Sequence, residues 1–111
     1  MPVLKYNETP AHQVKEGVNR KLLYLNDLMT VIIDFTNGPW DEPDAPHSHP
    51  HEQTCYLAEG EIIFICEGEP DQILKAGDMF SVPSNKLHTI QLLSKTARLV
   101  DSFNPIRRDF I

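Results

Sequence analysis

Turn-forming residues recur about every eight to twelve residues along this 111-residue chain. Asn26-Asp27, Asn37-Gly38, Gly60 and Gly77 separate short apolar runs that are rich in β-branched residues, the pattern of strands joined by tight turns. No segment keeps an apolar helical period over the roughly 11 residues that an amphipathic helix needs. The pattern therefore predicts an all-β barrel or sandwich, in which few sheet edges stay unpaired.

The length predicts one domain, residues 1–111. Residues 1–13 contain Pro2 and Pro10 and are expected to form an N-terminal arm or edge strand, since proline cannot donate to an internal ladder. Residues 104–111 form a C-terminal tail. Strands are expected within 14–25 (two strands and a turn), 28–35, 54–58, 62–66, 72–75, 79–82, 88–93 and 97–103.

The charge of the chain is acidic, with 10 Lys plus Arg against 16 Asp plus Glu and a net charge of −6 at pH 7. Such a chain repels nucleic acid and anionic lipid surfaces. It also lacks an apolar window of the roughly 18 residues that span a bilayer, and a basic, apolar leader. We expect a cytoplasmic protein without nucleic-acid or membrane partners, in which Cys55 and Cys66 are small buried side chains in a reducing compartment.

Three of the five histidines fall within the segment His47-Ser-His-Pro-His-Glu-Gln53. In a regular strand His47, His49, His51 and Gln53 would point to the same face. Clustered imidazoles are typical ligands of divalent transition metals, and the alternative interpretation is a polar surface loop. The cluster therefore predicts a metal site.

The arrangement His47-x-His49-xxx-Gln53-xxxxxx-Gly60 resembles the first sequence motif of the cupin superfamily, with Gln in place of the usual Glu. Within this segment His51 occupies a position where cupins place no ligand, and it is expected to contact a metal ligand or to lie at the rim of the pocket. Glu52 is a competing oxygen donor. Strand alternation favours Gln53, because it shares a face with His47 and His49.

A second stretch, Gly77 to His88, resembles the second cupin motif, with Gly77, Pro83 and His88 at the expected spacing. Asn85 stands where that motif has Gly, and Leu92 stands where it has Asn. Asn tolerates the left-handed backbone that Gly usually supplies, so the first departure is conservative.

The resemblance implies a double-stranded β-helix barrel of the jelly-roll-like cupin type, with one divalent transition metal per chain. Zn, Fe, Ni, Cu and Co suit such imidazole-rich ligands, Mn suits them less, and the sequence does not choose among them. Neutral ligands would leave the charge of the ion uncompensated, which favours a small anionic, sugar-like substrate carrying a carboxylate. The ligands that the resemblance implies are His47, His49, Gln53 and His88.

The C-terminal segment from Asp101 to Phe110 resembles the tail of pectin-degradation cupins, which linearise 4,5-unsaturated uronates to 5-keto uronates. The resemblance implies functional roles for Asp101, Phe103 and Arg107. Asp101 would shuttle a proton, and Arg107 would clamp the carboxylate of the substrate. The structural alternatives are that Asp101 caps a strand end, Phe103 belongs to the core, and Arg107 forms a surface pair with Arg108.

Two other functions stay open at this stage, namely an iron-dependent cupin dioxygenase and a non-catalytic sugar-binding or sensor module. Small cupins commonly pair through an N-terminal arm. Residues 1–13, together with Ile32 and Ile33, therefore predict a homodimer.

Overall fold

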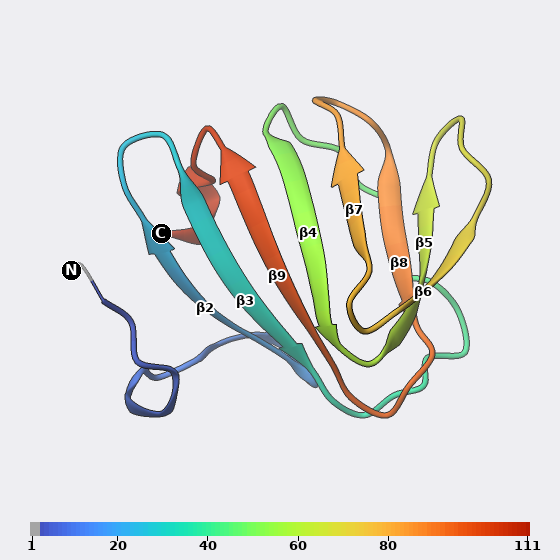
Figure 1. Ribbon diagram of the computed structural model, residues 1–111, viewed down its shortest axis with the longest axis horizontal. Coiled ribbons are helices and arrows are strands. Elements are labelled where there is room, and N and C mark those ends of the chain that lie inside the picture. Colours follow the sequence, from blue (N-terminus) through green and yellow to red (C-terminus); the bar gives the residue numbers. More distant parts are fainter. Residues whose placement is uncertain (1–2) are drawn as a thin grey trace.

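The computed structural model describes residues 3–111, which form two antiparallel sheets (Figure 1). One sheet has six strands in the order β1-β2-β3-β9-β4-β7, and the other has three in the order β6-β5-β8. Two 3-10 turns, η1 (Tyr6–Glu8) and η2 (Arg108–Phe110), flank them. The strands are β1 (His12–Lys15), β2 (Val18–Tyr24), β3 (Met29–Phe35), β4 (Glu52–Glu59), β5 (Glu61–Cys66), β6 (Gln72–Lys75), β7 (Met79–Val82), β8 (His88–Leu92) and β9 (Ala97–Asn104). The all-β prediction is confirmed.

Strand β9 lies at the centre of the larger sheet and shows why these residues form half-buried strands. Its alternate residues Ala97, Leu99, Asp101 and Phe103 are buried, whereas the residues between them are partly exposed. This period of two is what a pleated strand requires when one face packs against a core. Asp101 is the charged member of the buried row, and its position matters for the site described below.

The apolar core lies between the two sheets, at the end where β4 turns into β5. Its largest cluster consists of Val18, Phe35, Cys55, Leu57, Ile62, Leu92, Ala97 and Leu99. A second cluster of Met29, Val31, Phe103 and Ile106 joins the tail to β3 and β9. Both Cys55 and Cys66 are buried and unbridged, as expected.

The expected strands 72–75 and 79–82 coincide with β6 and β7, and the others differ from the observed strands by a few residues at their ends. The edge strand β1 spans His12–Lys15, whereas Tyr6–Glu8 form a 3-10 turn. Pro2 lies outside the described residues. No helix in the described part of the chain has the length and apolar character needed to cross a membrane.

The regular strand alternation that would place His47, His49, His51 and Gln53 on one face does not extend through the histidine segment. Between His47 and His51 the only strand-like pairing is an isolated bridge from His47 to His88, and β4 begins at Glu52. Pro46 and Pro50 flank this stretch and have no backbone N–H to donate to a ladder. Isolated backbone hydrogen bonds hold the segment instead. Asn85 N–H donates to His49 O at 2.8 Å, and His47 and His88 bond to each other.

Candidate metal centre and active site

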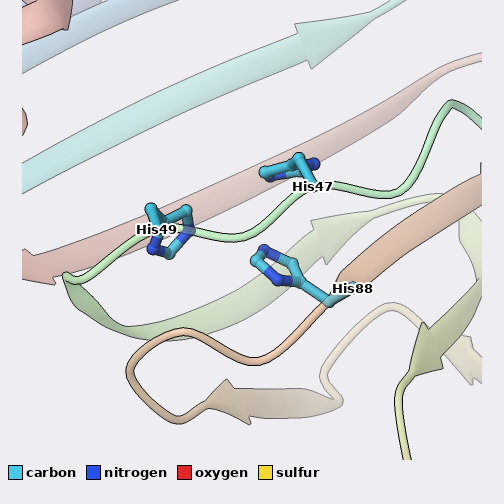
Figure 2. A group of neighbouring side chains, drawn as sticks. All are labelled: His47, His49 and His88. Atoms are coloured by element: carbon cyan, nitrogen blue, oxygen red, sulfur yellow. The ribbon is translucent and has the colours of Figure 1, made fainter.

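Three imidazoles converge beside the larger sheet (Figure 2). His47 and His49 come from the irregular segment that precedes β4, and His88 is the first residue of β8. Their nearest ring nitrogens all lie within 4.8 Å of one another. The bridge between His47 and His88, with N–H to O distances of 3.0 and 2.9 Å, joins the two segments and fixes this approach.

Hydrogen bonds to the backbone fix which nitrogen of two rings faces the centre. His49 Nδ1 donates to His51 O at 2.9 Å, and His88 Nδ1 donates to Lys86 O at 2.8 Å, so Nε2 of each ring keeps its lone pair. Burial lowers the pKa of all three rings, that of His47 to about 4, and keeps them neutral near pH 7. Among the described residues, the buried Nε2 of His88 has no hydrogen-bond partner.

Gln53, at the start of β4, faces the same centre. Its Nε2 donates to Asp101 Oδ1 at 3.0 Å, and this turns its Oε1 toward His49 Nε2 at 3.2 Å. The neutral ring of His49 carries its single proton on Nδ1, so the lone pair of its Nε2 faces a lone pair of Gln53 Oε1. A cation between them removes this conflict, and the lowered pKa of His49 disfavours a proton in that role. The donor set therefore fits a divalent metal ion.

The two neighbouring candidates lie apart from this centre. Glu52 is exposed on the opposite face of β4 from Gln53. His51 is not part of the imidazole cluster that His47, His49 and His88 form. The bend at Pro50 and His51 interrupts the strand alternation that would have aligned His51 with His47.

Asp101 is a buried carboxyl group, with 3 % of its surface exposed. On β9 it lies opposite Val31 of β3 and Cys55 of β4, so its neighbours in the sheet are apolar. Desolvation raises the pKa of Asp101 to about 6, and the adjacent Cys55 thiol and Gln53 amide offset part of the rise. The side chain does not cap a strand end, since it sits inside β9.

A cavity of about 310 Å³ opens beside these groups, and all of the predicted site residues except His49 line it. Nine of its eighteen lining residues are apolar and nine are polar, so the cavity offers both apolar walls and many polar partners to a small molecule. The polar lining consists of His47, Gln53, His88, Thr89, Asp44, Asp101 and the three cationic side chains Lys15, Arg20 and Arg107.

The C-terminal tail closes one side of the cavity. Arg107 lines it, and its Nη2 and Nε contact the Asp109 carboxylate at 2.9 and 3.4 Å. The Arg107 guanidinium also lies 4.2 Å from the ring centroid of Phe110. Arg107 is thus a cavity residue, whereas Arg108 is exposed. Phe103 is both core and cavity wall, with its ring edge-to-face against His49 at 5.7 Å.

Two cavity residues, Arg20 on β2 and Phe110 on η2, were missed by the sequence analysis. The pattern Val18-x-Arg20-x-Leu22 carried a signal for the first, since it places a charge on the inward face of a strand. No comparable signal existed for Phe110, whose position depends on how the tail folds back.

Comparison with known proteins agrees with this geometry. Residues 34–103 match the family model described as "Cupin domain". The chain is 36% identical over 107 residues to "Pectin degradation protein KdgF" of Dickeya dadantii, covering 95% of this chain and 94% of the relative. The solved structure of KdgF from Halomonas sp. superposes with a TM-score of 0.84 at 31% identity, covering 95% of each chain. An RmlC-like cupin from Shewanella frigidimarina gives 0.89 at 30% identity, covering 100% of this chain and 96% of the other.

Proposed function

Because this chain belongs to the cupin domain family, we propose that it is a metal-dependent enzyme that opens 4,5-unsaturated uronates to linear 5-keto uronates. Its relative in Dickeya dadantii bears the name of a pectin degradation protein, and 4,5-unsaturated uronates are the sugars that pectate lyases release. The observation that carries the proposal is the buried Asp101 carboxyl group, which lies on the wall of the cavity that His47 and His88 also line.

The metal would be held by the two histidines of the irregular segment, by the amide oxygen at the start of β4 and by the first residue of β8. A bound divalent ion supplies Lewis-acid polarisation of substrate oxygens. Its positive charge is not neutralised by these uncharged ligands, so it also favours an anionic substrate. The proposed ligands are His47, His49, Gln53 and His88.

Asp101 is proposed to move the proton in the reaction. The anomeric hydroxyl loses its proton to the Asp101 carboxylate while the bond between C1 and the ring oxygen breaks, which leaves an aldehyde at C1 and an enolate at C5. The protonated Asp101 then delivers the same proton to C4, so the enolate becomes a ketone, the carboxylate is regenerated and the reaction is a net isomerisation. A carboxyl group with a pKa raised to about 6 exchanges protons readily near neutral pH.

Arg107 and Phe103 would orient the sugar. Phe103 offers an apolar wall for the ring of the substrate, next to His49. The Arg107 guanidinium is held in place by Asp109, and the donors that Asp109 does not use are available to oxygen atoms of the substrate. Both residues therefore act in binding and positioning.

The proposal is tested by following the ultraviolet absorbance of unsaturated galacturonate, because ring opening removes its conjugated double bond. The metal-loaded protein should accelerate this loss well above the spontaneous rate, and His88→Ala and Asp101→Ala should abolish the acceleration. His12→Ala, at an exposed histidine of β1, is the matched control and should keep full activity. A wild-type rate equal to the spontaneous rate at every metal loading would refute the proposal.

We also propose that the protein is a cytoplasmic homodimer. Apolar side chains on the outer face of the larger sheet support a self-association surface, since Ile32, Val100, Tyr56 and Met79 are successive cross-strand neighbours on β3, β9, β4 and β7. Tyr56 and Met79 are 42% and 67% exposed. Sedimentation equilibrium should give a dimer for the wild type and a monomer for Met79→Glu, and a monomeric wild type would exclude the dimer.

A further inference from the structure

Arg20 is a cationic side chain on the inward face of β2, where the fold otherwise places apolar residues. Its neighbours in the inward row are Val18, which is buried, and Leu22, which is partly buried. Across the sheet it pairs with Ile33 of β3, which also lines the cavity. The register therefore directs Arg20 into the cavity rather than into solvent.

Arg20 differs from the other two cations of the cavity in having no carboxylate partner. Lys15 is paired with Asp44 at 2.7 Å, and Arg107 is paired with Asp109 at 2.9 Å. Within residues 3–111, Arg20 forms no salt bridge within 4.0 Å, and its buried Nε has no hydrogen-bond partner. The one cation left unpaired thus faces the cavity.

The surroundings of Arg20 hold its guanidinium in place without neutralising it. The central carbon of the group lies over the ring of Phe110, 3.9 Å from its centroid, a cation–π contact that restrains the guanidinium. Burial and the nearby Arg107 both disfavour its charge, and only Asp109 opposes them. A guanidinium in this position costs stability, which an apolar residue beside Val18 and Leu22 would avoid.

We infer that Arg20 binds the carboxylate of the substrate and makes the protein selective for acidic over neutral sugars. A guanidinium presents paired N–H donors that match both oxygens of a carboxylate. In Arg107 the Nε and Nη2 atoms are taken up by Asp109, whereas among the described residues the Arg20 guanidinium has no carboxylate partner and its buried Nε has no hydrogen-bond partner. That the acid is a uronate rests on the proposed function, but the preference for a carboxylate does not.

Selectivity is measured by NMR titration of the metal-depleted protein with D-galacturonate and with D-galactose, so that no metal contributes to binding. Wild type should bind galacturonate at least about tenfold more tightly, the range expected for charge-assisted hydrogen bonds. Arg20→Gln should bring the ratio of the two affinities close to one, and Arg20→Lys should restore part of it. Arg108→Gln, which removes one positive charge at an exposed position, is the control and should leave the ratio unchanged.

Thermal unfolding of Arg20→Met separates this role from a structural one. If Arg20 serves the ligand, the apolar variant should unfold at the same temperature as wild type or higher while it loses the preference for galacturonate. Equal binding of both sugars by wild type, or an unchanged ratio in a folded Arg20→Gln protein, would overturn the inference. A protein that opens no unsaturated uronate but still shows the Arg20-dependent preference would refute the proposed reaction and leave this inference standing.

Discussion

At the scale of single residues, the site is built around a carboxyl group that the fold does not need. Asp101 lies between Val31 and Cys55 in an inward row of the larger sheet, where an apolar residue would pack without a desolvation cost. Its pKa is raised to about 6 chiefly by that desolvation. A titratable group kept in an unfavourable place beside a cavity is a common property of functional residues.

Asp101→Asn should lower the rate of ring opening by about 10²–10⁴-fold, the usual contribution of a general acid or base. The same variant should be at least as stable as wild type at pH 7. The folded-state pKa of Asp101 is raised from 3.8 to about 6, so its ionisation costs stability above that range and costs nothing below about pH 4. Thermal unfolding should show a larger gain for the variant at pH 7 than at pH 4. Full activity in Asp101→Asn would remove Asp101 from the mechanism.

Substitution of His88, a proposed ligand, and of His51, a nearby histidine outside the cluster, should affect zinc affinity differently. His88→Ala removes a buried Nε2 that has no partner among the described residues and should weaken zinc binding by at least about 10²-fold. His51 lies outside the imidazole cluster, so the zinc affinity of His51→Ala should stay within a few-fold of the wild-type value. Calorimetric titration at pH 7 measures both. Equal losses in the two variants would place His51 among the ligands.

At the scale of elements, the turns are more constraining than the strands they join. Gly60, between β4 and β5, has a φ of +93°, and a Cβ there would lie 2.5 Å from Thr96 O and 2.7 Å from Ala97 Cβ. Gly77, between β6 and β7, has a φ of +101° with no atom within 4 Å of the same position. The two glycines share a backbone requirement but differ in available space.

Gly77→Ala should therefore cost only the strain of placing a Cβ on a left-handed backbone, about 1–2 kcal/mol in the free energy of unfolding. Gly60→Ala should cost more, because Thr96 and Ala97 must move away from the added methyl group. Urea unfolding of the two variants compares the costs directly. Equal destabilisation would mean that the loop around Thr96 yields without penalty.

The bounds of a strand could be predicted best where turn residues or proline delimit the strand on both sides. Strands β6 and β7 were predicted with their observed bounds, because Asp71, Ala76-Gly77-Asp78 and Pro83 delimit them sharply. Strand alternation did not hold through the histidine segment, since Pro46 and Pro50 have no backbone N–H to donate to a ladder and His47 alone forms a bridge there. The imidazoles of His47 and His49 still converge with that of His88, because isolated backbone hydrogen bonds to β8 and to Asn85 replace the ladder.

The side-chain pairings of the site could not be predicted in the same way. Strand alternation indicated that Asp101 and Phe103 share a face, and both do line the cavity. The contact of Arg20 with Phe110, and the absence of a carboxylate partner for Arg20 within residues 3–111, depend on how the tail folds against β2. That long-range arrangement is not encoded in any local pattern.

At the scale of the whole molecule, stability should depend on pH through the metal-centre histidines. Their folded-state pKa values lie below 6.5, that of His47 at about 4, so the unfolded chain binds more protons between these values. Stability of the metal-free protein should therefore fall as pH falls from 6.5 toward 4. The raised pKa of Asp101 acts in the opposite direction, but it is a single group and the three histidines together should outweigh it. Thermal unfolding between pH 4 and 7 measures the dependence, and His47→Gln should flatten it; a melting temperature that rises toward pH 4 would contradict it.

The most direct test of the proposed reaction is a single-turnover experiment in D2O, with NMR observation of unsaturated galacturonate mixed with excess metal-loaded protein. Proton transfer within the cavity should remove the vinyl signal at C4 far faster than the spontaneous reaction and place deuterium on one face of C4, whereas Asp101→Asn should do neither. Loss of the vinyl signal at the spontaneous rate, with deuterium on both faces of C4, would contradict the assignment of this protein as an enzyme that opens unsaturated uronates.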